Sequence, residues 1–250
     1  MNIKNKIKKI TKFFVPSFFP TDSFECFLRK INIHNIYVVQ IGACDGFTSD
    51  PIYSYIKKYH WQGVLVEPIP FLFKKLKKFY KDHQGLSFEN SAIYKNKCQI
   101  DMLTIDPKLS NISTVPDWFF GYSSLARSDL FGQELWTSTV GKEIIKTGLD
   151  KKTVDKYVHK IKVNAITWAN LIEKYSIKKI DLLQIDAEGY DFEILQQIDY
   201  HQISPKLIHF EYGRLSDIDF GSAIRFLIDK GYVVVDINFN DILLINSKFY

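Results

Sequence analysis

The sequence is poor in cysteine. Its 250 residues include only Cys26, Cys44 and Cys98, and none of these stands in a C-x-x-C spacing. A disulfide framework needs cysteine pairs and a structural zinc site needs closely spaced ones, so neither is predicted. Unpaired cysteines fit a reducing compartment, and we expect a cytoplasmic protein.

The sequence also lacks a long apolar run near its start. The stretch 13–16 (FFVP) is too short for a signal core or a membrane-spanning helix. Ile3, Ile7 and Ile10 instead recur at helical spacing, opposite the lysines. We therefore predict a basic helical extension over residues 1–36. Its beginning could lie weakly on the inner, anionic face of a membrane, although packing on the domain is the preferred interpretation.

Beyond that segment, the chain has no surplus of charge of either sign. Residues 1–20 contain no acid and hold the lysines that account for the net charge of +5, namely Lys4, Lys6, Lys8, Lys9 and Lys12. The rest of the chain is formally neutral. A nucleic-acid-binding domain usually carries its basic charge over a folded face, so we predict that nucleic acid is not a partner. The oligomeric state is left open.

From residue 37 onward, apolar strand-like segments alternate with helix-like ones. The predicted strands are 37–41, 64–67, 86–93, 161–166, 180–186 and 206–211, and the predicted helices are 48–60, 70–80, 167–175, 190–198 and 216–230. This order predicts one α/β domain over 37–250 with a doubly wound, mostly parallel sheet. A closing hairpin, "YVVVDIN" followed by "DILLIN", should add one antiparallel edge strand.

One segment, at about 112–160, breaks this alternation. It is rich in aromatic residues and is predicted to be an aromatic-rich, helical insertion. A long insertion in a compact domain is typically a lid or a binding loop, and the alternative is a helical excursion that buries its own aromatics. As a lid, it would offer Tyr122, Ser124 and Arg127 to a substrate.

Polar residues follow the predicted strands where each one ends, and open parallel sheets bind ligands at this edge. The first strand is followed by Gly42, Ala43, Cys44, Asp45 and Gly46, and the later ones by Glu67, Asn90, Ser91, Asp186, Glu188 and Glu211. The first loop lacks the third glycine of G-x-G-x-x-G, and its acid would repel a pyrophosphate but suit a cationic amine. Packing of a tight turn is the alternative reading of the glycines.

Glu67 adds to this interpretation. A carboxylate at the end of the second strand can accept hydrogen bonds from both hydroxyls of a ribose. An exposed glutamate before "PIP" is the alternative. Together with the glycine loop, Glu67 suggests an adenosine-containing cofactor without phosphates, and S-adenosylmethionine fits this description.

The motifs "VVQIGACDG", "VLVEPIPFLFKKL", "ENSAI", "DLLQIDAEGYDFEIL" and "LIHFEYGRL" occur in an order that resembles the FkbM-like methyltransferase family. The resemblance covers about 37–245 and implies a class I, Rossmann-like fold, S-adenosylmethionine with its product S-adenosylhomocysteine, and O-methylation, often of sugars or secondary metabolites. A surface-polysaccharide precursor is one such acceptor.

The resemblance also implies roles for individual residues. Gly42 and Asp45, with Ala43 and Gly46, would lie near the methionine part of the cofactor. Glu67 would bind the ribose, with Pro68 beside it. The adenine would lie near Asn90, Ser91 and Ala92, and Asp186 and Glu188 would face the methyl-transfer site. The sequence departs from the family at Gln40, where an acid is common, and at Gln184, where a lysine is common.

Methyl transfer to an alcohol needs aligned reactants and a base for the hydroxyl proton. Asp186 is the preferred base, and Glu188 and His209 are further catalytic candidates. Glu188 could instead favour the following helix, and His209 could be a buried, hydrogen-bonded core residue. Glu211 and Arg214 are candidates for binding the acceptor. A metal site built from the acids is possible in principle, but none is predicted.

Two functions of other classes stay open on the sequence alone. One is an NAD-dependent oxidoreductase, which the missing glycine and Asp45 disfavour. The other is a non-catalytic scaffold associated with a membrane through its basic N-terminus. The presence of Glu67 and Asp186 disfavours a scaffold.

Overall fold

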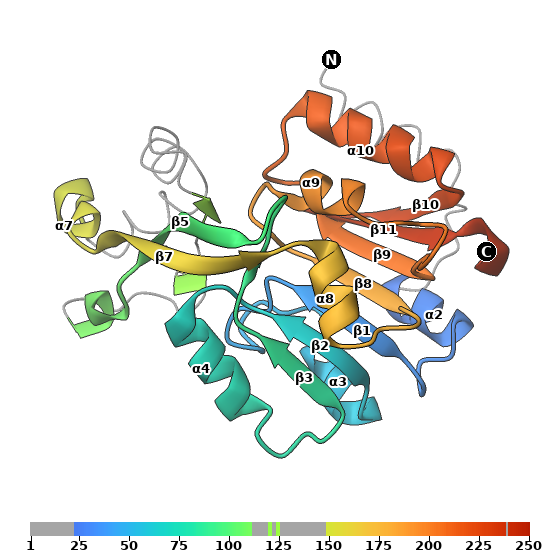
Figure 1. Cartoon of the computed structure of the whole chain (residues 1–250), viewed down its shortest axis with the longest axis horizontal. Helices are drawn as coiled ribbons and strands as arrows, with labels where there is room; N and C mark the ends of the chain where they lie inside the picture. The colour runs from blue at the N-terminus through green and yellow to red at the C-terminus, as the bar shows by residue number, and fades with distance from the viewer. Residues whose placement is uncertain (1–22, 112–119, 122–123, 126–148, 239) are drawn as a thin grey trace.

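The main sheet has seven strands in the part of the chain that the structure describes. In the computed structural model, which describes residues 23–111, 120–121, 124–125, 149–238 and 240–250, the strand order is β10-β11-β9-β8-β1-β2-β3 (Figure 1). The strands are β1 (Tyr37–Ile41), β2 (Gln62–Val66), β3 (Leu86–Glu89), β8 (Leu182–Ile185), β9 (Leu207–Glu211), β10 (Tyr232–Ile237) and β11 (Asp241–Asn246). Pairing is parallel from β3 to β9, which confirms the predicted mostly parallel sheet.

The C-terminal hairpin differs in one detail from the prediction. Strand β11 is antiparallel to both β9 and β10, so it is the antiparallel strand of the sheet. It does not form the edge, because β10 lies outside it. The hairpin folds back so that its second strand pairs with β9, which a pattern of apolar residues cannot reveal.

Helices cover both faces of the main sheet. Helices α2 (Ser23–Lys30), α3 (Tyr53–Tyr59) and α4 (Pro70–Phe79) pack on one face, and α8 (Trp168–Lys174), α9 (Asp191–Gln196) and α10 (Asp217–Asp229) pack on the other. Adjacent strand residues point to opposite faces, so Val38 joins the first layer and Val39 the second. The predicted doubly wound α/β fold is therefore confirmed.

Helix α3 is shorter than predicted. It begins at Tyr53, whereas the predicted helix began at residue 48. Residues 48–50 form a loop instead, with Ser49 in the left-handed region at φ 58°. The Asp50 carboxylate accepts a hydrogen bond from the backbone N–H of Ile52 at 2.8 Å and so closes a turn around Pro51.

A second, smaller sheet was not predicted. It has the order β4-β7-β5-β6, with β4 (Ala92–Ile93), β5 (Cys98–Ile105), β6 (Ser124–Leu125) and β7 (Val158–Ile166). The predicted strand 86–93 divides between the two sheets. The small sheet projects from the main body (Figure 1), with η1 (Pro107–Asn111) and α7 (Lys151–Asp155) at its far end. Its residues Met102 and Val163 pack against Ile69 and Leu72.

Some predictions fall outside the described residues. These are the membrane-facing helix within 1–20, the substrate candidates Tyr122 and Arg127, and most of the insertion. Ser124 lies in β6, where the structure describes its pairing with Leu103. Of the predicted extension, α2 packs on the main sheet through Phe27 and Leu28. In the described part of the chain, every helix is too short or too polar to cross a membrane.

Candidate active site

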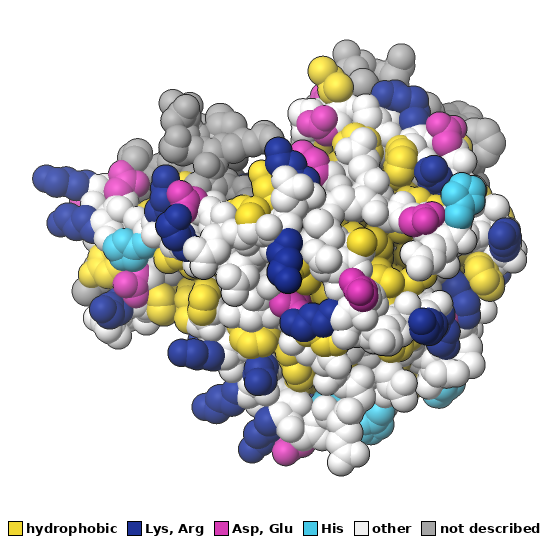
Figure 2. All heavy atoms as spheres, viewed as in Figure 1, with side chains coloured by type: hydrophobic (Ala, Val, Ile, Leu, Met, Phe, Trp, Pro, Cys, Tyr) yellow, Lys and Arg dark blue, Asp and Glu magenta, His cyan; other side chains and the backbone are white. Residues whose placement is uncertain are grey.

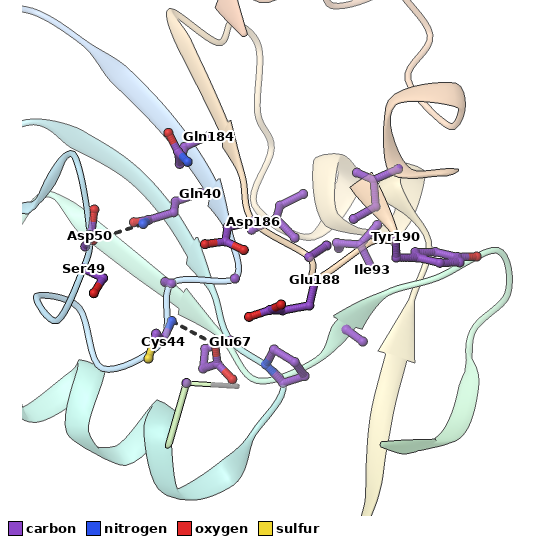
Figure 3. Close-up of a pocket in the computed structure, with 18 of the residues that line it drawn as sticks. Gln40, Cys44, Ser49, Asp50, Glu67, Ile93, Gln184, Asp186, Glu188 and Tyr190 are labelled. Carbon is purple, nitrogen blue, oxygen red and sulfur yellow. Dashed lines mark hydrogen bonds between the residues drawn. The ribbon is translucent and has the colours of Figure 1, made fainter. Parts of the chain in front are cut away.

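A cavity of about 300 Å³ opens at the carboxyl ends of β1, β2 and β8 (Figure 3). This volume is within the range of small-molecule sites. The predicted cofactor residues Gly42, Ala43, Glu67, Pro68, Ser91, Ala92 and Asp186 line it, together with Glu188 and Arg214. These residues come from five separate parts of the sequence, and each was predicted from its position near the end of a strand. The structure brings them together around one cavity.

Glu67 is held firmly in this cavity. Its carboxylate accepts hydrogen bonds from the backbone N–H groups of Cys44 at 2.9 Å and Ile69 at 2.7 Å, which ties the loop after β1 to the end of β2. Burial raises the pKa of Glu67 to about 8, against these hydrogen bonds, which lower it. A carboxylate fixed in this way is already oriented when a ligand with hydroxyl donors arrives.

Gly42 lets two chain segments meet beneath the cavity. It has φ 80°, and a Cβ atom added to it would lie 1.8 Å from the carbonyl oxygen of Asp186. The glycine was predicted to make room for a ligand. The structure adds a second reason, because the backbone after β8 occupies the space that a side chain would need.

The Gly42→Ala variant is therefore expected to lose roughly 3 kcal/mol or more of unfolding free energy, because backbone must move to remove the overlap. Gly189→Ala is a matched control: Gly189 also has positive φ, at 99°, but its added Cβ would lie 3.4 Å from the Cβ atom of Arg214, an ordinary contact distance. It should lose only about 1 kcal/mol, from the left-handed backbone. Urea unfolding of both variants measures the difference. Equal losses would mean that the close approach to Asp186 is unimportant.

Four ionisable side chains after β8 and β9 form one electrostatic unit. Arg214 Nε donates to Glu188 Oε2 at 3.0 Å. Asp186 is exposed to the cavity, where desolvation raises its pKa, although the charge of Arg214 and a hydrogen bond with Glu211 lower it. Burial, followed by the charge of Asp186, raises the pKa of Glu211 to about 10 and of Glu188 to about 8. At neutral pH, Glu211 is therefore protonated and can donate its proton to the Asp186 carboxylate.

The loop that carries Glu188 has a strained backbone, and hydrogen bonds to Asp191 hold it in place. Glu188 has φ 51°, an unusual backbone conformation for a residue with a side chain. Asp191 is fully buried and accepts hydrogen bonds from the backbone N–H groups of Ala187 at 3.3 Å and Gly189 at 3.2 Å. Cys44 and Ser49, which also line the cavity, share the left-handed conformation. Such strain gathers at functional sites because it persists only where the surroundings impose it.

Three predicted cofactor residues do not face the cavity. Asp45 is buried and accepts hydrogen bonds from the N–H groups of Phe47 and Thr48 and from the Thr48 hydroxyl, so it closes its own turn. Gly46 lies against Leu76 and Tyr80. Asn90 Nδ2 donates to the carbonyl oxygens of Glu67 and Pro68, at 2.8 and 3.1 Å. Each of these residues shapes the loops around the cavity.

His209 lies apart from the cavity. It is buried in β9, where its Nδ1–H donates to Gln184 Oε1 at 2.6 Å. Burial lowers its pKa to about 4, so the ring is neutral at physiological pH. This arrangement matches the buried, hydrogen-bonded alternative, and we omit His209 from the proposed catalytic groups. Glu211 is likewise not a lining residue, and it meets the site through Asp186.

Several cavity residues had no predicted role in binding. Asp50 and Ser49 lie at one end, where Gln40 Nε2 donates to Asp50 Oδ2 at 3.1 Å, and Tyr190 and Ile93 lie at the other end (Figure 3). Asp50 was missed because it was placed inside a helix. The dipeptide Asp50-Pro51, which is typical of a turn before a helix, was the signal that could have found it.

Among the described residues, no group of three or more His, Cys, Asp or Glu side chains is arranged to hold a metal ion. The acids around Asp186 instead pair with Arg214 and with backbone N–H groups.

Three acids with raised pKa values predict an unusual pH dependence of stability. The pKa values of Glu67, Glu188 and Asp191 are raised by burial to about 8, from about 4 in an unfolded chain. The folded protein therefore binds more protons than the unfolded chain in this interval, and stability falls as pH rises. We expect the ligand-free protein to be less stable to urea at about pH 9 than at about pH 6, and Glu188→Gln to reduce that difference. Stability that rises between these values would contradict the assignment.

A doubly wound sheet with a cavity lined by carboxyl groups at its carboxyl edge is the arrangement of a class I, Rossmann-like fold with a ligand-binding site. Residues 40–234 match the model of the methyltransferase FkbM domain, and the chain belongs to this family.

Similar solved structures also include methyltransferases. A methyltransferase FkbM from Methylobacillus flagellatus KT is 10% identical with a TM-score of 0.47, and the match covers 85% of this chain and 44% of that one. Aeropyrum pernix fibrillarin with natively bound S-adenosyl-L-methionine is 9% identical, with coverages of 84% and 66% and a TM-score of 0.41. A precorrin-6y C5,15-methyltransferase from Geobacter metallireducens GS-15 is 12% identical, with coverages of 92% and 90% and a TM-score of 0.38.

These similarities are too low to transfer a substrate or a residue role. The chain spans less than half of the Methylobacillus protein. No curated protein matches it significantly.

The family uses S-adenosylmethionine as its cofactor, and the cavity suits this molecule. The cofactor carries a cationic sulfonium, a cationic amine and a ribose, and it has no phosphate. The described lining supplies the carboxyl groups of Asp50, Glu67, Asp186 and Glu188, and Arg214 is its one cationic side chain, already paired with Glu188. A lining of carboxyl groups favours a cation, because a nearby positive charge lowers their raised pKa values, and it disfavours a pyrophosphate.

Proposed function

We propose that the protein is an O-methyltransferase that transfers the methyl group of S-adenosylmethionine to a hydroxyl group of a sugar, a nucleotide-sugar or a related polar metabolite. The observation that carries this proposal is that the carboxyl group of Asp186 lines the same cavity as Glu67, with Glu211 next to it. Bound at Glu67 and Pro68, the cofactor supplies a methyl group that is already electrophilic. The remaining requirement is a base for the acceptor hydroxyl.

Asp186 fulfils this requirement. Its carboxyl group lines the cavity and is exposed to it, so an acceptor hydroxyl can reach it. Glu211 keeps its own proton at neutral pH and donates a hydrogen bond to Asp186, which holds the carboxylate in place. The acceptor hydroxyl then loses its proton to the free lone pair of Asp186. Arg214 limits the repulsion among the acids through its pair with Glu188.

A polar acceptor agrees with the chemistry next to Asp186. Hydroxyl groups can donate to carboxylates and accept from Arg214, and a sugar presents several of them in fixed geometry. The choice of sugar over another polar metabolite rests on the resemblance to the family, and a surface-polysaccharide precursor is the proposed acceptor. Cytoplasmic location belongs to the same proposal, and weak contact of residues 1–20 with a membrane is the alternative to their packing on the domain.

Methyl transfer from S-adenosylmethionine carrying a labelled methyl group tests the proposal directly. The protein would be incubated with sugars, nucleotide-sugars and matched deoxy analogues, and the products analysed by mass spectrometry. The proposal expects label on an oxygen of at least one sugar and none on the analogue that lacks this hydroxyl. Label on nitrogen, carbon or sulfur acceptors alone would overturn O-methylation but keep the family assignment.

The two alternatives from the sequence have less support. The family match disfavours an NAD-dependent oxidoreductase, and the carboxylate lining disfavours a dinucleotide.

On the face shown in Figure 2, basic side chains of the described residues are interspersed with acidic ones. This distribution agrees with the prediction that nucleic acid is not a partner, which stays a prediction. Deletion of residues 1–20 followed by vesicle sedimentation tests the membrane contact.

A further inference from the structure

We infer that Asp50, positioned by Gln40, is the anionic partner of the amino group of the cofactor. This role was predicted for Asp45, whose carboxylate is fully used in its own turn. The inference rests on the cofactor of the proposed reaction, and it concerns residues that the sequence left without a binding role.

The first observation is the orientation of the Gln40 amide. A carboxylate only accepts hydrogen bonds, so the Nε2 group of Gln40 must face Asp50, to which it donates at 3.1 Å. The amide oxygen, Oε1, therefore points elsewhere. It is buried and has no hydrogen-bond partner among the described residues. Gln40 is 3% exposed, and its side chain borders the cavity.

An unpartnered, buried amide oxygen costs free energy unless a donor reaches it. The Asp50 carboxylate lies next to this oxygen. One of its oxygens accepts a hydrogen bond from Gln40, and the other accepts one from the N–H of Ile52. An ammonium group has three donors and a positive charge, so it can satisfy Oε1 and Asp50 together. A neutral hydroxyl offers one donor and no charge, and a carboxylate or phosphate would be repelled.

The second observation is the place of this pair in the cavity. Asp50 and Gln40 lie at one end, Glu67 lies along the side, and Tyr190 and Ile93 lie at the opposite end (Figure 3). Asp186 and Glu188 lie between the two ends. A ligand whose ribose is held at Glu67 can thus extend a cationic amine toward Asp50. The hydrogen bond from Gln40 holds the Asp50 carboxylate at this end of the cavity.

Calorimetric titration of the full-length protein tests the inference with two probes. One is S-adenosylhomocysteine, and the other is its analogue in which hydrogen replaces the amino group. The wild type should bind the amine-bearing probe about 10- to 100-fold more tightly, as expected for a charge-assisted hydrogen bond. In Asp50→Asn, which keeps the acceptor for Ile52, the preference for the amine should disappear, while affinity for the analogue changes by no more than about twofold.

Two variants complete the design. Gln40→Leu removes both the donor to Asp50 and the unpartnered oxygen, and it should reduce the same preference. Asp241→Asn is the matched control, because Asp241 is an acid near Asp186 that does not line the cavity. It should retain the wild-type preference. Melting temperatures check that each variant is folded.

The outcomes separate the inference from the proposed function. Equal loss of both probes in Asp50→Asn would overturn the inference, because Asp50 would then only shape the loop. An unchanged preference in that variant would overturn it as well. Failure of the wild type to bind either probe would instead refute the cofactor assignment on which the proposed function depends.

Discussion

Replacing Asp186 with Asn is expected to slow methyl transfer by about 10²- to 10⁴-fold, the contribution of a positioned general base. The amide cannot take the proton of the acceptor hydroxyl, although it keeps the shape of the carboxylate and can still hydrogen-bond Glu211. Affinity for S-adenosylhomocysteine should fall much less, because Glu67 and the loop after β1 are unchanged. Single-turnover rates with labelled cofactor, at saturating acceptor, measure this effect.

The matched variant is again Asp241→Asn. It removes a nearby acid whose pKa burial raises to about 6 but which does not border the cavity. Its rate should remain within about threefold of the wild type, as expected for independent sites. A wild-type rate in Asp186→Asn would contradict the assignment of the base. Glu211→Gln, which preserves a donor to Asp186, should be slowed less than Asp186→Asn.

The Glu67→Ala variant is expected to bind S-adenosylhomocysteine at least about 100-fold more weakly than the wild type. Two charge-assisted hydrogen bonds to a ribose contribute roughly 1.5–3 kcal/mol each. The substitution also frees the backbone N–H groups of Cys44 and Ile69, which shape the loop. Calorimetric titration measures the affinity.

Glu67→Gln separates the two contributions. It keeps the size of the side chain but offers one carbonyl oxygen to the two backbone donors. We expect an affinity between those of the wild type and Glu67→Ala. If Glu67→Ala binds as tightly as the wild type while remaining folded, the cofactor does not use this carboxylate.

Most of the fold could be predicted because its signals are local. Runs of apolar, β-branched residues mark the buried strands, and Thr167 and Ser216, residue types typical of N-caps, cap α8 and α10. Strand β5 was missed because its antiparallel partner β7 lies beyond the insertion, with Cys98 opposite Ala165. Pairing across such a distance leaves no signal within a short window of sequence.

Site residues could be predicted from the sequence where the position of the backbone alone decides whether a residue reaches the cavity. Glu67 and Asp186 directly follow their strands, and any residue there reaches the carboxyl edge of the sheet. Asp45 and His209 differ, because the direction of their side chains depends on a turn and on the face of a strand. Asp45 turns back to Thr48, and His209 points to Gln184. Asp50 enters the cavity because the chain turns before α3 begins.

Titration of the wild-type protein with S-adenosylmethionine, S-adenosylhomocysteine and NAD tests the central claim most directly. A carboxylate-lined cavity should bind both sulfur-containing ligands with micromolar affinity and should not bind the dinucleotide. Binding of NAD alone, or of none of the three by folded protein, would contradict the account.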